Sequence, residues 1–151
     1  MLPALVATSA SEVLDEIADG IARAVTETSA AAVRMGFLER EELGTTAIGN
    51  GFAIPHCRLE GARRVHLAVA RHPVGVDFGA PDGAPVRVFF AIVAPHSRAR
   101  EHLEALAAVA RFLREPGRRE HLLGAPGEKE LMTALSADVL RRAGAGEPSH
   151  A

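Results

Sequence analysis

The sequence predicts a single α/β domain, because segments with helical periodicity alternate with segments of strand character. Apolar residues recur at helical spacing early in the chain and again after residue 98. Between them, residues 86–93 form a nearly continuous apolar run, which is typical of a strand buried on both faces near the middle of a sheet. The sequence has no internal repeat, so we expect one domain over residues 1–140 and a flexible tail over residues 141–151.

The composition argues against several classes of function. The 151 residues are 48% hydrophobic and 24% charged, as expected of a globular protein with a real core. A net charge of -2 and an aromatic content of 4%, without Trp or Tyr, argue against nucleic acid as a partner. The single cysteine, Cys57, rules out an internal disulfide. Without a signal-peptide pattern or a long apolar run, we expect a cytoplasmic protein with no direct membrane insertion.

Two helices are expected in the first 42 residues. Ser9–Glu12 has the form of a capping box, and the apolar residues behind it share one helical face. That predicted face consists of Val13, Leu14, Ile17, Ala18, Ile21 and Val25. A second helix is expected from about Ser29 to Glu41, with its inward residues at Val33, Phe37 and Leu38.

Besides the buried strand over residues 86–93, one more strand and three further helices are expected after residue 64. Alternating apolar residues at 65, 67 and 69 predict the strand. Ser97 is placed to cap the next helix. The predicted core face of that helix consists of Leu103, Leu106, Ala107, Ala110 and Leu113. Two shorter helices are expected over residues 118–123 and 128–135.

Residues 43–59 have a different character, which predicts a loop or broken strands. Glycines and Pro55 interrupt the short apolar pieces of this segment. Glycines let backbone N–H groups approach a ligand, and Pro55 restricts the backbone directly before His56. An imidazole is nucleophilic near neutral pH, and N–H groups favour phosphoryl oxygens. The segment therefore suggests an anion-facing histidine, and a glycine-rich turn followed by a structural histidine is the alternative.

The stretch Leu38–His56 resembles the signature of the enzyme IIA domains of the bacterial phosphoenolpyruvate:sugar phosphotransferase system (PTS). It is similar to the type 2 class, the fructose/mannitol class, which includes nitrogen-regulatory IIA proteins. The pattern here reads Leu38-Glu39-Arg40-Glu41, then Gly49-Asn50-Gly51-Phe52-Ala53-Ile54-Pro55-His56. Later landmarks follow in order, namely Val76-Asp77-Phe78, Asp82-Gly83, Pro85-Val86 and His102-Leu103-x-x-Leu106. The resemblance covers about residues 5–138 and implies a mixed central β-sheet flanked by helices.

The resemblance also implies a phosphotransferase that works through a phosphohistidine. His56 would accept a phosphoryl group from the phosphocarrier protein HPr and pass it to the cysteine of a IIB component for sugar uptake. His102 matches the second active-site histidine of the family and Arg40 its arginine. Phosphoryl transfer demands mainly positioning and electrostatic stabilisation, so the resemblance implies no cofactor and no metal. Cys57 and Phe52 depart from the family pattern, in which Gly and an aliphatic residue are usual.

The destination of the phosphoryl group has an alternative. In a free-standing nitrogen-regulatory IIA protein, the same phosphohistidine would switch the binding of regulatory target proteins, because phosphorylation adds about -1.5 to -2 charges. A metal-dependent hydrolase is a third hypothesis, but the histidines lack a standard zinc spacing.

The predicted site residues could also be ordinary structural or surface residues without a role in catalysis. Arg40 lies in a charge run of the kind that usually forms solvated ion pairs, and His102 could be a packing residue near a helix start. A two-histidine site predicts that the rings of His56 and His102 lie within about 10 Å of each other at the sheet edge. His72 is expected at the end of its strand. No site role is expected for His66, His72, His96, His121 and His150.

Overall fold

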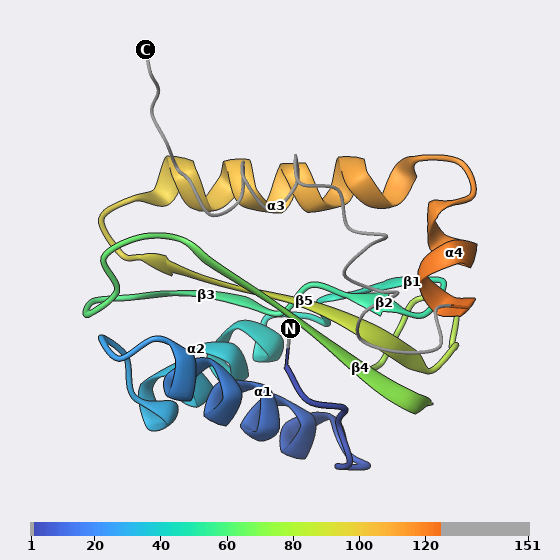
Figure 1. Cartoon of the computed structure of the whole chain (residues 1–151), viewed down its shortest axis with the longest axis horizontal. Coiled ribbons are helices and arrows are strands. Elements are labelled where there is room, and N and C mark those ends of the chain that lie inside the picture. The colour runs from blue at the N-terminus through green and yellow to red at the C-terminus, as the bar shows by residue number, and fades with distance from the viewer. Residues whose placement is uncertain (1, 125–151) are drawn as a thin grey trace.

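The computed structural model describes residues 2–124, and these residues form three layers (Figure 1). Helices α1 (Ala10–Ala24) and α2 (Ala30–Glu42) cover one face of a central sheet. Helix α3 (Ala99–Arg114) covers the other face, and the short helix α4 (Arg118–Gly124) follows it. The predicted α/β class is confirmed. The expected helix over residues 128–135, His150 and the expected tail lie outside the described residues.

The sheet is mixed, and strand β5 (Val86–Pro95) is its centre, as the apolar run predicts. Strand β4 (His66–Val76) pairs with one side of β5 in antiparallel orientation. Strands β2 (Phe52–Ala53) and β3 (His56–Leu59) pair with the other side in parallel orientation. Strand β1 (Ala47–Gly49) pairs with β2 in antiparallel orientation. The predicted broken strands between residues 43 and 59 are therefore confirmed.

Strands β2 and β3 form one line that is interrupted just before His56. Phe52 lies opposite Val88 and His56 opposite Ile92, so the register is the same on both sides of the interruption. Pro55 has no N–H and keeps the preceding residue extended, but its carbonyl still accepts a hydrogen bond from the Ile92 N–H at 2.9 Å. Residues 54 and 55 therefore depart from strand geometry, while β3, which begins at His56, keeps the same register with β5 as β2.

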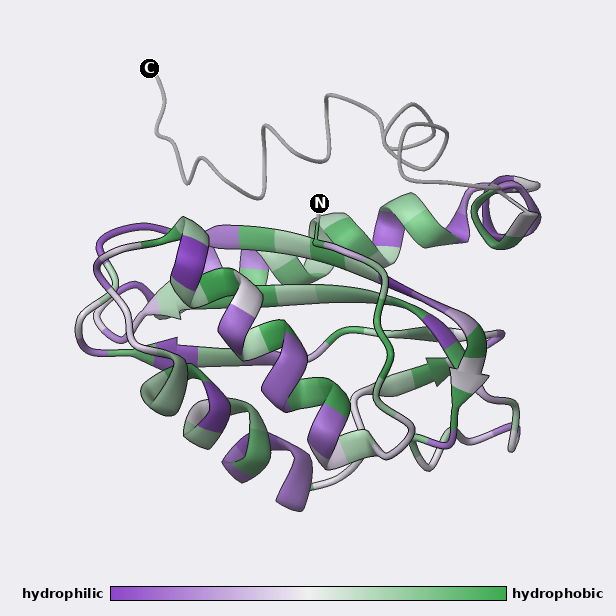
Figure 2. Cartoon of the chain, turned by 60° about the horizontal axis from the view of Figure 1, so that its bottom comes forward, coloured by the Kyte–Doolittle hydropathy of each residue, from purple (hydrophilic) through white to green (hydrophobic). Residues whose placement is uncertain are grey.

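The sheet separates two apolar clusters. Cys57 and Phe89 belong to the cluster beneath α1 and α2. Phe52 and Ile54 belong to the cluster beneath α3. Because side chains alternate along the strand line, His56 shares the α3 face with Phe52 and Ile54, and Cys57 faces the opposite layer. Figure 2 shows the result for residues 2–124: hydrophilic and hydrophobic stretches alternate along the helices, while the strands behind them are mainly hydrophobic.

Both predicted helix starts in the first half of the chain are confirmed. The Ser9 hydroxyl accepts a hydrogen bond from the Glu12 N–H at 3.3 Å, and the Ser29 hydroxyl accepts one from the Ala32 N–H at 3.1 Å. These contacts satisfy N–H groups that have no partner within a helix, so each serine acts as an N-cap. The predicted inward face of α1 is buried from residue 13 to residue 21.

Helix α3 differs from its prediction at its cap and on its face. It begins at Ala99 after the N-cap Arg98, which makes no side-chain cap bond, so Ser97 does not cap it. The predicted core residue Leu103 is 64% exposed, and the face turned to the sheet includes His102 instead. The buried residues of α3 are His102, Ala105, Ala108, Val109, Phe112 and Leu113. Small alanines on this face let the helix lie close to the sheet, a weaker sequence signal than the large side chain of Leu103.

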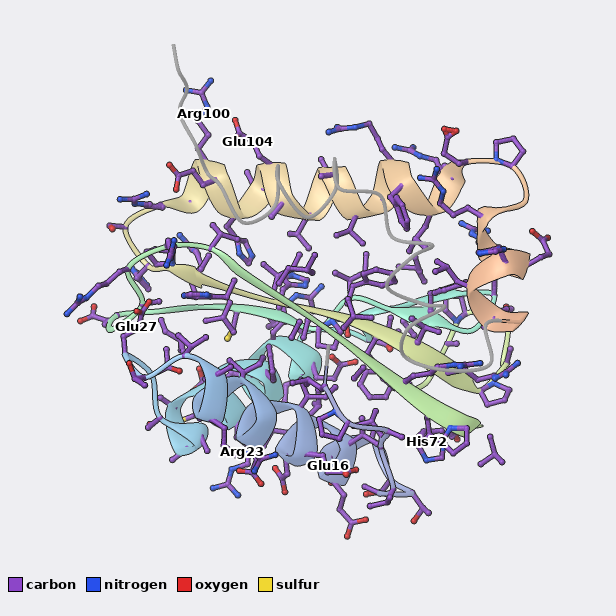
Figure 3. All side chains as sticks on the ribbon, viewed as in Figure 1. Glu16, Arg23, Glu27, His72, Arg100 and Glu104 are labelled. Carbon is purple, nitrogen blue, oxygen red and sulfur yellow. The ribbon has the colours of Figure 1, made fainter. Side chains whose placement is uncertain are left out.

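His72 is buried within β4 rather than lying at the end of a strand, which corrects the prediction. Its Nε2 donates to the Ala7 carbonyl at 2.9 Å, and its Nδ1 accepts hydrogen bonds from the N–H groups of residues 74 and 75. The pairing of β4 with β5 shifts register between Arg71 and Val76, and there the His72 ring supplies hydrogen bonds that the neighbouring strand does not. Strand β4 continues beyond His72 to Val76. Glu16 of α1 also accepts from the Ala7 N–H, so the N-terminal segment is held from both sides (Figure 3).

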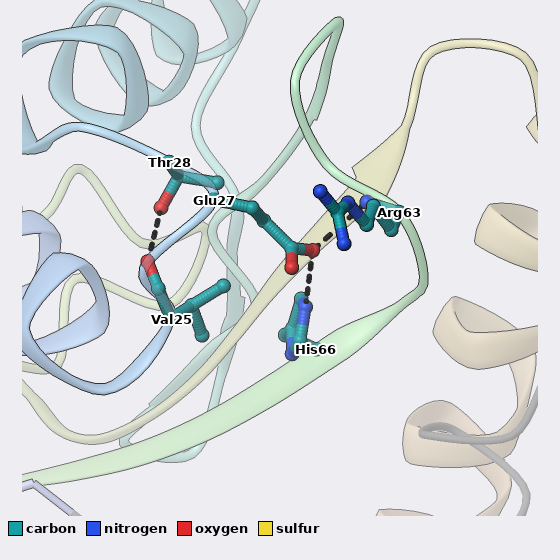
Figure 4. Close-up of polar contacts among 5 residues, drawn as sticks. All are labelled: Val25, Glu27, Thr28, Arg63 and His66. Carbon is teal, nitrogen blue, oxygen red and sulfur yellow. Dashed lines mark hydrogen bonds and ion pairs between the residues drawn. The ribbon is translucent and has the colours of Figure 1, made fainter.

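Glu27 joins two turns that are far apart in sequence (Figure 4). Its carboxylate accepts hydrogen bonds from the Arg63 backbone N–H at 2.8 Å and from the His66 Nε2 at 3.1 Å. The Arg63 bond, followed by the His66 bond, lowers the pKa of Glu27. On the same turn, the Thr28 hydroxyl donates to the Val25 carbonyl at 3.2 Å. His66 therefore has a structural contact, away from the two-histidine pair described below.

Helix α2 lies close to β3 because residue 36 is a glycine. A Cβ atom placed on Gly36 would lie 2.8 Å from the Cys57 Sγ and 2.9 Å from the Cys57 Cβ. Cys57 is buried at this contact, and its burial raises the pKa of the thiol to about 12. A neutral thiol that packs against a helix, on the sheet face opposite His56, is explained by packing alone.

We expect Gly36→Ala to destabilise the fold by about 1–3 kcal/mol in urea unfolding, because the new methyl group overlaps Cys57. This sign is opposite to the usual gain of about 0.5–1 kcal/mol for alanine over glycine within a helix. In a Cys57→Gly background both overlapping atoms are absent, so the same substitution should cost nothing or stabilise. Equal costs of Gly36→Ala in the two backgrounds would contradict the contact.

Candidate active site

His56 is the first residue of β3, and both nitrogens of its ring make hydrogen bonds. Nδ1 lies 2.7 Å from the Ile54 carbonyl oxygen, and the Nε of Arg40 donates to Nε2 at 3.1 Å. A carbonyl oxygen only accepts, so the proton must be on Nδ1. The Arg40 N–H only donates, so Nε2 must carry a lone pair. Two contacts from different elements therefore assign the same neutral tautomer.

The surroundings of His56 also favour the neutral ring. Burial is the main cause that lowers the pKa of His56, and the positive charge of Arg40 lowers it further. The hydrogen bond to Ile54 and the charge of Glu41 act in the opposite direction, and the net effect is a pKa below the usual histidine value. At neutral pH the half-buried ring is uncharged, with its lone pair on Nε2.

His102 faces His56 from the first turn of α3. The ring centroids lie 5.3 Å apart with their planes at 49°, so the expected proximity of the two rings is confirmed. The side chain is buried, and among residues 2–124 its Nδ1 has no hydrogen-bond partner. Burial, followed by the charges of His56 and Arg58, lowers the pKa of His102 to about 4. The pair therefore consists of two neutral imidazoles at pH 7.

Arg40 reaches this pair from the helical layer on the other face of the sheet. It lies near the C-terminal end of α2, and its Nη1 also donates to the Gly44 carbonyl at 2.9 Å. The interpretation of Arg40 as part of a solvated charge run is wrong, because its guanidinium bridges the His56 ring and the loop after α2. The structure thus brings Arg40, His56 and His102 together.

Glu41 and Thr46 are not among the residues predicted for the site, yet they support it. The Glu41 carboxylate accepts hydrogen bonds from the Thr46 N–H at 2.9 Å and from the Thr46 hydroxyl at 2.8 Å. The Thr46 carbonyl in turn accepts from the Ile54 N–H at 3.0 Å. In the sequence, Glu41 is one of several charged residues at the end of a helix and Thr46 is one of several small residues in a loop, so nothing in the sequence shows that the two side chains meet.

The turn between β1 and β2 explains the glycines upstream of His56. Gly49, Asn50 and Gly51 have φ angles of 93°, 59° and 91°, a left-handed backbone that glycine adopts at little cost. The Asp82 carboxylate accepts from the Asn50 N–H at 2.8 Å, and this bond is the first cause that lowers the pKa of Asp82. The Asn50 N–H is therefore used within the fold, and the glycines serve the turn.

The remaining described histidines lie outside the pair: His96 and His121 are exposed, and His66 and His72 have the contacts given above. Among residues 2–124, no group of three or more His, Cys, Asp or Glu side chains is arranged to hold a metal ion. Over the same residues, no helix combines the length and the apolar character needed to cross a membrane.

The sequence matches a known protein family. Residues 2–138 match the family described as phosphoenolpyruvate-dependent sugar phosphotransferase system, EIIA 2. The chain belongs to this family. The EIIA type 2 resemblance of the sequence is thereby confirmed. A nitrogen regulatory protein of Pseudomonas aeruginosa is 41% identical to this EIIA over 123 residues, which cover 82% of this chain and 80% of that protein.

Two solved structures are similar to this EIIA. The crystal structure of the nitrogen regulatory protein IIA-Ntr from Neisseria meningitidis has a TM-score of 0.80 and 32% identity, and covers 87% of this chain and 90% of that chain. The second is a complex of IIA mannitol with phosphorylated IIB mannitol from Escherichia coli. It has a TM-score of 0.69 at 18% identity, covers 88% of this chain and 91% of that chain, and shows the shared fold. In that complex an EIIA of this fold associates with a IIB component.

We expect His102 to make the stability of the fold depend on pH. The folded-state pKa is about 4 and the ordinary histidine value is 6.5, so between these values the unfolded chain binds more protons. The stabilisation is complete above pH 6.5 and falls progressively until the pH has passed below 4, by about 3 kcal/mol in all. Urea unfolding between pH 7 and pH 4.5 measures most of this loss.

His102→Gln should reduce the loss, because glutamine does not titrate. A pH dependence that is the same in wild type and His102→Gln would contradict the lowered pKa of His102.

Proposed function

We propose that this chain is a cytoplasmic phosphoryl carrier that accepts a phosphoryl group on His56 Nε2 from an HPr-type phosphocarrier protein. The observation that carries the proposal is the tautomer of His56. Its Nδ1–H is bound to the Ile54 carbonyl, its Nε2 lone pair accepts from Arg40, and the His102 ring lies beside it with the centroids 5.3 Å apart. Membership of the EIIA type 2 family supports the phosphoryl group as the cargo.

Because of this tautomer, no proton has to be removed from His56 before it attacks phosphorus. The Nε2 lone pair forms the new bond to phosphorus while the bond to the donor breaks and its electron pair returns to the donor. Nε2 carries no proton, so no base is needed to remove one before attack. The phosphorylated ring keeps its Nδ1–H, and the Ile54 carbonyl oxygen, 2.7 Å away, stabilises the positive charge that develops on the ring.

Arg40 has two positions in this reaction. In the unphosphorylated protein its Nε–H occupies the Nε2 lone pair, so this hydrogen bond must break before phosphorus can approach. The released guanidinium then offers its donor fork to the phosphoryl oxygens, whose negative charge it matches. The Gly44 carbonyl keeps the side chain near the ring during this change.

His102 acts as a neutral donor to the phosphoryl group. An unpartnered buried N–H is rarer in proteins than an unpartnered buried acceptor. The unpartnered Nδ1 of His102 therefore places the ring proton on Nε2. From there the N–H would donate to a phosphoryl oxygen held between the two rings, whose centroids lie 5.3 Å apart.

Exposed leucines next to the site suit a protein donor better than a small one. Leu43, which follows Arg40 in the chain by three residues, is 83% exposed, and Leu103, adjacent to His102, is 64% exposed. Exposed apolar side chains that neighbour Arg40 and His102 in the chain offer contact area for a partner surface.

We expect the chain to gain an acid-labile phosphate when it is incubated with phosphoenolpyruvate, enzyme I and HPr, because His56 then receives the phosphoryl group. His56→Gln should lose this labelling, since glutamine has no nucleophilic ring nitrogen. Mass spectrometry of the wild-type and His56→Gln proteins after incubation measures whether each protein has gained the phosphate from phosphoenolpyruvate. His96→Gln is the matched control and should label like wild type. Undiminished labelling of His56→Gln would refute the assignment.

The phosphoryl group has two candidate destinations. The family description and the IIA–IIB complex favour transfer to a IIB cysteine and thus sugar uptake. The printed names of the Pseudomonas relative and the Neisseria structure favour a nitrogen-regulatory module, whose phosphorylation changes the binding of target proteins. In both cases His56 is the acceptor, and only the next partner differs.

We expect the regulatory role to appear as a change of partners with the charge at His56. His56→Asp adds a negative charge at the site, whereas His56→Ala removes the ring without adding one. Affinity capture from the native host with each variant, followed by mass spectrometry, compares the bound proteins. Different partners for the two variants indicate a switch, whereas identical partners, together with transfer of label to a purified IIB component, indicate sugar uptake.

A further inference from the structure

A continuous chain of hydrogen bonds runs from the C-terminal turn of α2 to the His56 ring. It begins at the Glu41 carboxylate, which binds both the N–H and the hydroxyl of Thr46. It continues from the Thr46 carbonyl to the Ile54 N–H at 3.0 Å, and from the Ile54 carbonyl to His56 Nδ1 at 2.7 Å. Every link lies within ordinary hydrogen-bond distance, so the ring is tied to one helix end through two loop segments.

We propose that Glu41 is a positioning residue of the site, which sets the tautomer of His56 by holding the loop segment that presents the Ile54 carbonyl. This inference rests on the proposed function, because the tautomer matters only if His56 Nε2 is the nucleophile. Glu41 makes no hydrogen bond to the ring itself, and its charge acts to raise the pKa of His56. It acts through Thr46, which is 5% exposed and whose polar groups have no water to replace a lost carboxylate.

The position of Glu41 beside Arg40 gives this arrangement a further property. Arg40 binds the Nε2 side of the ring and the Gly44 carbonyl, while Glu41 secures the Nδ1 side through Thr46 and Ile54. Two consecutive residues of one helix therefore control the two nitrogens of the same imidazole. When Arg40 leaves Nε2 to meet the phosphoryl group, the Glu41 chain is the contact that keeps the ring in place.

Removing Glu41 should change the tautomer of His56, because an imidazole without a fixed hydrogen-bond partner can carry its proton on either nitrogen. Without its anchor, Thr46 shifts, the Ile54 carbonyl no longer aligns with Nδ1, and a neutral ring can carry its proton on either nitrogen. A proton on Nε2 occupies the lone pair that must attack phosphorus. Loss of alignment in a positioned nucleophile costs about 10- to 100-fold in rate.

The test compares Glu41→Leu with Glu41→Gln and with the neighbouring control Glu42→Leu, whose parent side chain is exposed. Nitrogen-15 NMR of the unphosphorylated protein measures the tautomer of His56, and rapid-quench labelling with phospho-HPr measures the transfer rate. Glu41→Leu should populate the Nε2–H tautomer and slow transfer at saturating phospho-HPr by about 10- to 100-fold, without raising the half-saturating HPr concentration.

Glu41→Gln should retain most of both properties, because its amide oxygen accepts from the Thr46 N–H and its amide N–H donates to the hydroxyl. Glu42→Leu should behave like wild type. A folded Glu41→Leu protein with the wild-type tautomer and rate would overturn the inference, as would an equal effect of Glu42→Leu.

If Glu41→Leu does not fold, Thr46→Val replaces it, since valine removes the hydroxyl link and preserves the shape. Thr46→Val should then shift the tautomer, and Thr46→Ser should restore it. A wild-type protein that takes no phosphoryl group would refute the proposed function, while the tautomer comparison in the unphosphorylated variants would still decide the role of Glu41.

Discussion

The hydrogen bond between His56 Nδ1 and the Ile54 carbonyl is the contact on which the site depends. At 2.7 Å it decides which ring nitrogen is free, and every other part of the site acts on that nitrogen. The bond exists because the strand line breaks at residues 54–55, which lets the Ile54 carbonyl turn to a side chain two residues later instead of to the sheet. The unchanged register on β5 keeps His56 in place while the backbone before it departs from strand geometry.

The site combines side chains from the two helical layers, which lie on opposite faces of the sheet. His102 comes from the layer on the His56 face, whereas Arg40 comes from the opposite layer and reaches around β3. A cation from one layer and a neutral imidazole from the other therefore approach one acceptor from different directions. An arrangement of this kind stabilises a spread negative charge without placing two positive charges in contact.

Much of this arrangement could be predicted from the sequence. The remainder depends on tertiary contacts, which local sequence patterns do not contain. The helix starts at Ser9 and Ser29, the buried central strand and the broken segment before His56 are local signals, and the structure agrees with them. The face of α3 could not be predicted, because periodicity ranks Leu103 above His102 and carries no information on which residue the sheet requires. The Glu41 contact was also out of reach, since a glutamate in a charge run looks like any solvated residue until Thr46 is seen beside it.

The contact between Gly36 and Cys57 ties the neighbour of the acceptor histidine to a helix remote in sequence. The two positions share one small volume, which can be filled from the strand or from the helix but not from both. Among relatives, the size of the residue at either position should therefore vary inversely with the size at the other. The cysteine after His56 would then reflect the close packing of α2 against the sheet. When the reactivity of such proteins is compared, the proteins should have the same residues at both positions and not only at the position after the histidine.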